Sequence, residues 1–298
     1  MDLLNNAFAA FVITYKRANI LPDTLAALFG QSLPPALILV VDNSPDDETR
    51  RLIAERADPR VAYHKMGYNA GPAGAARYAL EYLSNQGYKC VYWGDDNNAP
   101  KFQDDFERLI KLHREDTGIV AAVGHKFNKF FGRIERFNSA ELTGILEADT
   151  AGGGDCMLIS TTVVREGILP DARLFFGFEE LDFCIRIREK GFRIIVDGER
   201  FYQYRAVAGN LNKKAKVLNL RNSRMYALRE YYGKRNLIYI YKKHRMFAAL
   251  LNLVLKTVVK SLAGFRYGFR FGALNMRMML TSLMHGLVSR MGKTFDLR

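Results

Sequence analysis

The sequence predicts an α/β fold, a mostly parallel sheet with helices on both faces, followed by a basic amphipathic helical region. Short apolar runs alternate with helical patterns through residues 8–205, the order that builds parallel sheets. From Arg205 onward the chain carries 20 Lys and Arg against two acids, whereas residues 1–204 carry 24 bases and 29 acids. We therefore expect a first domain at 1–205 and a second region at 206–298.

The expected elements follow one another in a regular order. Apolar runs predict strands at 8–14, 36–41, 61–64 and 88–93, and the intervening patterns predict helices at 21–29, from 45 onward and at 75–83. Later strands are expected at 119–123, 156–160 and 192–196, with a hairpin in 126–138 turning at Gly132-Arg133. A helix ends at Lys190 because Gly191 is a typical helix stop. Ligands of such sheets bind beyond the carboxyl ends of the strands, so one cleft is expected there.

Composition narrows the class of protein. With 49% hydrophobic residues the chain can form a sizeable core. Its three cysteines have neither a disulfide framework nor zinc spacing, which favours buried thiols in a reducing compartment. The first residues lack the basic start and apolar block of a signal peptide, so none is expected. His64, His113 and His125 have no paired spacing and are expected to be structural or exposed.

An acid cluster follows the strand expected at 88–93. Asp95 and Asp96 are adjacent in Gly94-Asp-Asp-Asn-Asn98 and repel each other unless a positive group lies beside them. A divalent metal that carries a phosphorylated ligand would supply that charge. The alternative is a plain turn, because Asp and Asn are also common turn residues.

Two further segments lie at expected strand ends. Asp42 can accept hydrogen bonds from a ribose or a base, or it can cap the helix near Pro45. The glycines in 67–74 follow the pattern GxxxGxxG, which permits close approach to a phosphate at a helix N-terminus, and Arg77 could add a cation. An ordinary junction between loop and helix explains the same glycines.

Three acids, Glu179, Glu180 and Asp182, follow an aromatic block that ends at Phe178. Apolar neighbours raise the pKa of a carboxyl group and make it a better base near neutral pH. Acids are also favoured in the first turn of a helix without any catalytic role. We assign catalysis to Glu180 ahead of capping, and capping to Asp182 ahead of catalysis.

Five motifs together resemble the family 2 inverting glycosyltransferases. They are VITYKR at 12–17, VVDNS at 40–44, NAGPAGAAR at 69–77, the Asp95/Asp96 cluster and FEELDFCIR at 178–186. They occur in that family's order and cover residues 8–205. Arg235-Asn236-Leu237 and GLVSRMGK at 286–293 also resemble the bacterial rhamnosyl- and galactofuranosyltransferase branch.

The resemblance implies a GT-A fold, a nucleotide-sugar donor and one displacement at the anomeric carbon. The implied donor-binding residues are Thr14, Tyr15, Arg17, Asp42, Asn43, Asn69, Gly71, Gly74, Arg77, Asp95 and Asp96. Asp95, Asp96 and Asn97 match the region that binds diphosphate through Mg²⁺ or Mn²⁺. Glu180, with Glu179 beside it, matches the carboxylate that deprotonates the acceptor hydroxyl. Gly153, Gly154, Asp155 and Asp182 are assigned to the acceptor side.

Two positions depart from the family pattern. The D-x-D motif lacks one carboxylate in either register, and only Asp96 is a strong ligand in both. Many relatives carry a histidine near 202–205, where this chain has Tyr-Gln-Tyr-Arg. These departures predict weak metal binding, or a phosphate-neutralising part for Arg205.

The basic tail suits a membrane surface. Residues 236–263 combine apolar side chains with lysines and arginines, but the longest uncharged run, 246–255, has ten residues, against the ~20 that a membrane span needs. We expect a peripheral helix on the anionic cytoplasmic face, with no spanning helix. The alternatives are packing on the catalytic domain or homo-oligomer formation. Nucleic acid is not expected as a partner, because no nucleic-acid motif is present.

The expected activity is therefore transfer of a sugar from a nucleotide-diphosphate donor to a glycan acceptor carried on a lipid, in cell-surface polysaccharide or glycolipid synthesis. One rival is a nucleotidyltransferase acting on a sugar phosphate, which would release pyrophosphate. Another is a non-catalytic membrane-bound scaffold with the same fold.

Overall fold

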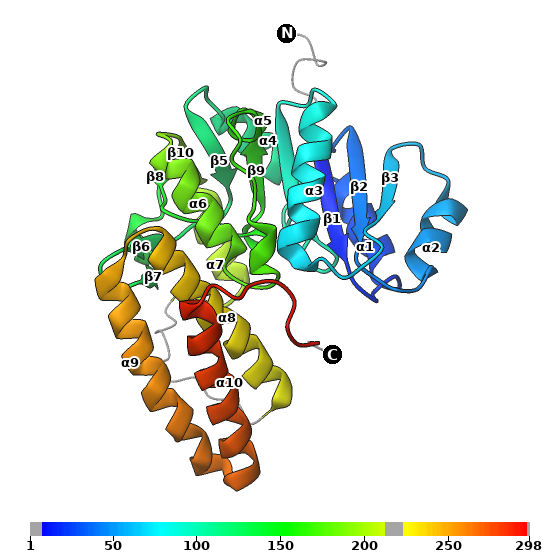
Figure 1. Cartoon of the computed structure of the whole chain (residues 1–298). Helices are drawn as coiled ribbons and strands as arrows, with labels where there is room; N and C mark the ends of the chain where they lie inside the picture. Colours follow the sequence, from blue (N-terminus) through cyan, green and yellow to red (C-terminus); the bar gives the residue numbers. More distant parts are fainter. Residues whose placement is uncertain (1–7, 212–222, 297–298) are drawn as a thin grey trace. The chain divides into compact units, whose positions relative to one another are not determined.

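The structure, a computed structural model, describes residues 8–211 and 223–296, apart from the side chain of Asp155. The chain divides into two compact units (Figure 1). The first comprises residues 1–126, 136–172 and 180–212, and the second comprises 127–135, 173–179 and 213–298. The main part of the second unit begins at residue 213, after the expected boundary at 205. Two short earlier segments, 127–135 and 173–179, also belong to this unit.

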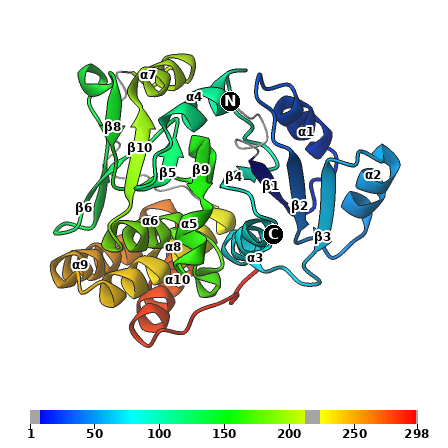
Figure 2. The ribbon, with the colours of Figure 1, turned by 90° about the horizontal axis from the view of Figure 1, so that it is seen from above.

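In the described residues, an eight-stranded sheet forms the centre of the first unit (Figure 2). Its order is β3-β2-β1-β4-β9-β5-β10-β8. The strands are β1 (Ala9–Thr14), β2 (Leu37–Asp42), β3 (Val61–Lys65), β4 (Cys90–Asp95), β5 (Thr117–Ala121), β8 (Ile145–Glu147), β9 (Met157–Ser160) and β10 (Arg193–Asp197). β9 runs antiparallel to β4 and β5, and β8 runs antiparallel to β10, while the other pairs are parallel. The predicted mostly parallel α/β fold is confirmed.

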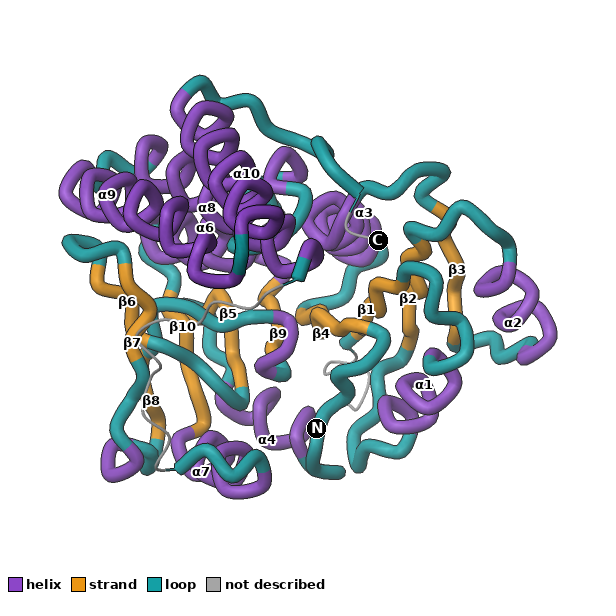
Figure 3. Tube along the Cα trace, turned by 90° about the horizontal axis from the view of Figure 1, so that it is seen from below, coloured by secondary structure: helices purple, strands orange, loops and turns teal. Residues whose placement is uncertain are grey.

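Helices cover both faces of this sheet (Figure 3). They are α1 (Leu21–Phe29), α2 (Glu48–Arg56), α3 (Gly71–Asn85), α4 (Asp105–Leu112), α5 (Thr161–Arg165), α6 (Glu179–Glu189) and α7 (Gly198–Val207). Apolar side chains of α3, α5 and α6 pack with one face of the strands. Those of α1 and α4 pack with the other face. The apolar runs of the strands are buried on both sides for this reason.

Strand register aligns the ends of the strands that precede the candidate site. Thr14 at the end of β1 pairs with Asp42 at the end of β2. Ile13 pairs with Asp95 at the end of β4. Because these strands are parallel, the loops that follow them leave the sheet at the same edge. The predicted convergence of the polar strand ends is confirmed.

The second unit contains the helices α8 (Arg224–Lys243), α9 (Phe247–Ala263) and α10 (Phe269–Leu287). Aromatic and apolar residues of α8 and α10, among them Tyr231, Tyr232 and Met279, form its buried core with Phe175. Residues 127–135 lie in a hairpin of β6 (Lys126–Asn128) and β7 (Arg133–Glu135), which turns before Arg133 as predicted. The Tyr241 hydroxyl donates a hydrogen bond of 2.7 Å to the carbonyl of Gly132 in that turn.

Asn236 on α8 binds the segment that leads into α6. Its fully buried side-chain amide donates to three carbonyls, those of Leu174 (2.8 Å), Phe176 (3.0 Å) and Gly177 (2.8 Å). Such a segment needs support, because Phe175 and Phe178 have positive φ angles of 59° and 66°. Since α6 follows directly in the chain, Asn236 fixes the backbone just before Glu180.

Candidate active site

Asp96 is tied to the loop after β1. The Thr14 hydroxyl donates to its Oδ2 (2.9 Å), and the Arg17 guanidinium donates to its Oδ1 (3.1 Å). Its backbone carbonyl accepts from the Thr24 hydroxyl at 2.6 Å, and the residue is only 5% exposed. Both carboxylate oxygens are therefore engaged within the protein. Asp95 is the more exposed of the two carboxylates, and the expectation that Asp96 binds a metal ion stays a prediction.

Asp95 and Glu180 form an interacting pair of carboxyl groups. Burial, followed by the nearby charges of Glu180 and Asp96, raises the pKa of Asp95 to about 7, while Arg17 acts in the opposite direction. Burial also raises the pKa of Glu180, although a hydrogen bond from the backbone of Gly153 partly offsets that rise. Like charges that act on each other favour a proton or another cation beside them. The end of β4 therefore combines a candidate base with a candidate cation ligand.

Two glycines let the backbone reach this acid pair. A Cβ on Gly153 would lie 2.7 Å from Cδ1 of Trp93, and a Cβ on Gly154 would lie 2.6 Å from Nδ2 of Asn98. Larger residues would displace this turn, and with it the Gly153 backbone that hydrogen bonds to Glu180. The side chain of Asp155, also assigned to the acceptor side, lies outside the described part of the structure.

Two other expected site acids are buried away from solvent. Asp182 has no exposed side-chain surface and forms an ion pair of 2.8 Å with Arg186. Its side chain therefore offers no exposed surface to an acceptor, and its assignment to the acceptor side stays a prediction. Glu179 opens α6 and is also buried, which leaves Glu180 as the candidate base.

Asp42 organises the loop after β2. Its Oδ1 accepts a hydrogen bond of 2.8 Å from the backbone N–H of Ser44, and its Oδ2 accepts one of 3.0 Å from the Tyr63 hydroxyl. The residue is 0% exposed, and helix α2 begins several residues later at Glu48. Asp42 does not cap α2, whose N-cap is Asp47, and the expected contact of Asp42 with a ligand stays a prediction. Asp42 instead holds the shape of the loop.

The next residue links β2 to the glycine segment. Asn43, which is also buried, accepts from the backbone N–H of Ala70 at 3.0 Å and donates to the carbonyl of Gly71 at 3.4 Å. The Gly71 N–H in turn donates to Oδ1 of Asn69 at 3.0 Å. Gly71 opens α3 with a φ of 70°, a conformation that favours glycine. The start of α3 is thus fixed beside the ends of β1 and β2.

Several donor-binding candidates keep exposed surface. Tyr15 and Arg17 are partly exposed in the loop after β1, and Arg77 is exposed on α3. A Cβ on Gly74 would lie 2.8 Å from that of Ala70, so the glycine allows a tight first turn of α3. Asn97 is exposed in the turn after β4. Tyr15, Arg17, Arg77 and Asn97 therefore keep surface that a ligand could contact.

A metal ion would have few protein ligands among the described residues. Within the described residues, no group of three His, Cys, Asp or Glu side chains could hold a metal ion. Mg²⁺ in proteins is often held by one or two carboxylates together with substrate phosphates. Asp95, with its raised pKa and its acidic neighbours, fits that kind of site together with the amide oxygen of Asn97. The residues therefore fit a metal held largely by the substrate.

The sequence patterns missed a set of basic residues. Lys101, His125 and Arg136 line a pocket in the first unit together with Arg205, to which the sequence assigned a phosphate-neutralising part. His125 had been expected to be structural or exposed. Lys101 and His125 follow β4 and β5, so the strand-end argument applied to Asp42 and Asp95 could have identified them.

Comparisons with known proteins agree with this geometry. The model of the family described as glycosyl transferase family 2 matches residues 9–163. Galactofuranosyltransferase GlfT1 of Mycolicibacterium smegmatis is 23% identical over 198 residues, which span 61% of this chain and 65% of that relative, somewhat less than two thirds of its length.

Solved structures share the fold. The mannosyltransferase PcManGT of Pyrobaculum calidifontis, in complex with GDP-mannose and Mn²⁺, has a TM-score of 0.56 at 13% identity, covering 95% of this chain and 87% of its own. GalNAc-T7 with UDP, GalNAc and Mn²⁺ has a TM-score of 0.57 at 12% identity, covering 81% of this chain and 48% of its own. These similarities establish a GT-A fold. Since the family match runs from β1 into α5 and covers more than half of the sequence, the chain belongs to glycosyl transferase family 2.

Proposed function

We propose that the protein transfers a sugar, with inversion, from a nucleoside diphosphate donor to a hydroxyl of a glycan acceptor carried on a lipid. The observation that carries the proposal is the interaction of Asp95 with Glu180 at the end of β4. A carboxyl group whose pKa is raised by burial is suited to accept a proton near neutral pH, and Glu180 has this property. The family membership and the fold support the same reaction class.

The reaction is one displacement. The acceptor oxygen forms a bond to the anomeric carbon as the bond from that carbon to the diphosphate breaks, and the acceptor proton passes to Glu180. The nucleoside diphosphate leaves with the electron pair of the broken bond. Since the acceptor attacks from the face opposite the leaving group, the configuration at the anomeric carbon inverts.

The donor would lie across the ends of β1, β2 and β4. Tyr15, Arg17, Asn69 and Arg77 keep surface that can contact it. Thr14 and Asp96 act indirectly, because their hydrogen bond helps to hold the loop that carries Arg17. The start of α3 offers backbone N–H groups and a favourable dipole to a phosphate.

Mg²⁺ or Mn²⁺ would be held by Asp95 and Asn97 with the phosphates of the donor. When bound, the ion would neutralise the charge that develops on the departing diphosphate. The Mn²⁺ in the two neighbouring structures supports the use of a divalent metal ion. With few protein ligands, binding is expected to be weak without the donor.

A membrane-facing role is proposed for α9. Its exposed apolar side chains recur every three or four residues, at Phe247, Leu251, Leu255, Val258, Val259 and Leu262. Among the described helices, the stretch Phe247–Tyr267 is long and apolar enough to cross a membrane by length and composition, and only 28% of its apolar window is buried. The ten-residue uncharged run in the sequence is shorter than the apolar helix, because two lysines lie within the helix. Core helices of soluble proteins can meet the same length and composition, but they are mostly buried.

We assign α9 to the interface of an anionic, cytoplasmic membrane surface rather than to a span. Lys256 lies within the helix, and Arg266 and Arg270 follow its end. Basic residues beside an apolar stripe suit a helix lying in the headgroup region. A contact between copies of the chain through α9 is the other arrangement that the stripe would permit.

Replacement of the base tests the function directly. Glu180→Gln preserves the size of the side chain and removes its ability to accept a proton. We expect sugar transfer to fall at least about 100-fold, since general base catalysis commonly contributes that much. Donor binding, measured by thermal stabilisation with a panel of nucleotide sugars, should persist. Full transfer by the variant would exclude Glu180 as the base, and a wild-type protein that neither binds nor transfers any donor would favour the scaffold.

A further inference from the structure

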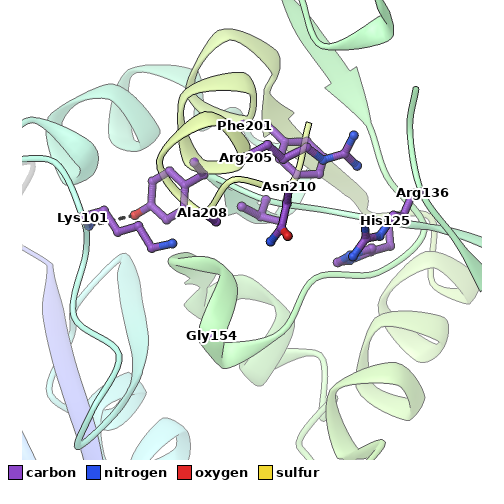
Figure 4. A pocket seen from close by; sticks show the side chains of 10 residues that line it. Lys101, His125, Arg136, Gly154, Phe201, Arg205, Ala208 and Asn210 are labelled. Atoms are coloured by element: carbon purple, nitrogen blue, oxygen red, sulfur yellow. Dashed lines mark hydrogen bonds between the residues drawn. The ribbon is translucent and has the colours of Figure 1, made fainter. Parts of the chain in front are cut away.

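A basic pocket lies in the first unit, on the half of the sheet formed by β4, β5 and β10. Its volume is about 200 Å³, several times the ~30 Å³ share of one water molecule. Basic side chains come from three separate elements: Lys101 after β4, Arg136 after β7 and Arg205 from α7 (Figure 4). Gly154 lines the same pocket. It follows Gly153, whose backbone hydrogen bonds to Glu180.

Helix α7 presents one face to this pocket. Phe201, Tyr204 and Arg205 of α7 line it together with Ala208, which follows the helix, at the spacing of neighbours on a helix surface. The Tyr204 hydroxyl donates a hydrogen bond of 2.6 Å to Asp105 on α4 and accepts one of 3.1 Å from the backbone of Lys101. These bonds fix α7 against the segment that follows β4. The pocket wall is therefore held in place by the fold.

The charge of Arg205 is only partly offset by that of an acid, Glu141. The residue is 9% exposed, donates one hydrogen bond of 2.7 Å to the carbonyl of Phe137, and lies 4.4 Å from the ring centroid of Phe201. Within the described residues it forms no ion pair, and neither does Lys101. A buried cation without a paired anion is costly, so an anion that entered the pocket would be stabilised.

The neighbouring groups respond to this positive charge. Burial, then Arg205 and Arg136, lowers the pKa of His125 to about 4. Burial and the proximity of Arg136 also lower the pKa of Arg205, while the charge of Glu141 acts in the opposite direction. Basic groups that disfavour one another's charge mark a site of positive potential. Arginine in particular matches phosphate, because its planar guanidinium can donate two parallel hydrogen bonds.

We propose that the pocket lined by Lys101, Arg136 and Arg205 binds a phosphate group of a substrate. The proposal rests on the proposed function for the identity of that substrate. The phosphate belongs either to the diphosphate of the donor or to a phosphate that joins the acceptor glycan to its lipid. Both share the chemistry that the pocket recognises, and kinetics separates them.

The first test is binding of inorganic pyrophosphate to the full-length protein, measured by calorimetry in the presence of a chelator. Lys101→Gln and Arg136→Gln should each weaken binding about tenfold, which corresponds to the ~1.4 kcal/mol of one charge-assisted contact. Lys190→Gln is the matched control, because it removes one exposed charge at the end of α6. Equal binding by wild type and both pocket variants would overturn the proposal, and so would an equal loss in Lys190→Gln.

The second test assigns the phosphate. If it belongs to the donor, the pocket variants raise the KM for the nucleotide sugar with any acceptor. If it belongs to the acceptor, they raise the KM only for acceptors that carry a phosphate. Pyrophosphate binding does not depend on transfer, so failure of the proposed glycosyl transfer is distinguishable from failure of the pocket. Arg205→Lys, which keeps the charge, should retain more binding than Arg205→Gln if the charge is responsible.

Discussion

Asp95 should destabilise the folded protein at neutral and higher pH. An unfolded aspartate titrates near ~3.9, whereas the pKa of Asp95 in the fold is about 7. Between these two values the folded state binds more protons than the unfolded state, so this group's contribution to stability falls as pH rises through that window. Below it the group is protonated in both states and contributes nothing. Asp95→Asn removes the ionisation and should therefore stabilise the protein at high pH only.

The size of the effect follows from the pKa. A difference of about three units, at ~1.4 kcal/mol per unit, gives roughly 4 kcal/mol above pH 8. Because Asp95 keeps some contact with solvent, we expect a gain of about 2–4 kcal/mol at pH 8.5 and little change at pH 4.

Urea denaturation can measure this difference through Trp93. It is the only tryptophan of the chain, is almost fully buried, and lies two residues before Asp95 on β4. Its fluorescence therefore reports on unfolding of the first unit. Equal stability of wild type and Asp95→Asn at pH 8.5, or a less stable variant, would refute the reasoning.

Asp96→Asn provides the matched control. The replacement breaks the ion pair with Arg17 and weakens the hydrogen bond from Thr14, so it should cost about 1–2 kcal/mol at pH 8.5. Adjacent aspartates are thus expected to have opposite effects. If both replacements shift stability in the same direction, the structural distinction between Asp95 and Asp96 is wrong.

Three further predictions concern parts that support the site. Asn236→Leu removes a buried amide that donates three hydrogen bonds, so it should cost about 3 kcal/mol in stability and lower kcat. Asn252→Leu removes one exposed hydrogen bond and should cost under ~1 kcal/mol, and equal effects of the two variants on urea denaturation would contradict the role of Asn236. Transfer should increase when Mn²⁺ or Mg²⁺ is added, and full turnover in excess chelator would remove the metal from the mechanism. Leu255→Asp should reduce co-sedimentation with anionic vesicles at low salt about tenfold. Ile145→Asp changes an exposed apolar position of the first unit and should not reduce it. A wild-type protein that stays in the supernatant would rule out membrane binding.

The main elements of the first unit could be predicted from the sequence because its strands are uninterrupted apolar runs. The predicted helix at 21–29 matches α1, and the predicted strands at 36–41 and 192–196 lie within one residue of β2 and β10. The short elements β8 and α7 were not predicted. β8 has only three residues at the edge of the sheet, and α7 carries charged and aromatic residues without a clear apolar period. Weak local patterns of this kind depend on tertiary contacts.

The candidate site was predicted in outline but not in detail. Spacing could show that Asp42, Asp95 and Asp96 lie at strand ends, but not which of their oxygens accept hydrogen bonds inside the protein. The Tyr63 hydroxyl that binds Asp42 and the Arg17 guanidinium that binds Asp96 come from other strands or loops. A sequence does not show such pairings, because they depend on register and side-chain direction.

The identity of the released product tests the central claim most directly. The purified protein is incubated with the nucleotide sugar that stabilises it most, an acceptor glycan on a lipid, and Mn²⁺. We predict release of a nucleoside diphosphate in equal amount to the sugar transferred, with the opposite anomeric configuration in the product by NMR. Release of pyrophosphate, retention of configuration, or transfer that is unchanged in Glu180→Gln would contradict the account.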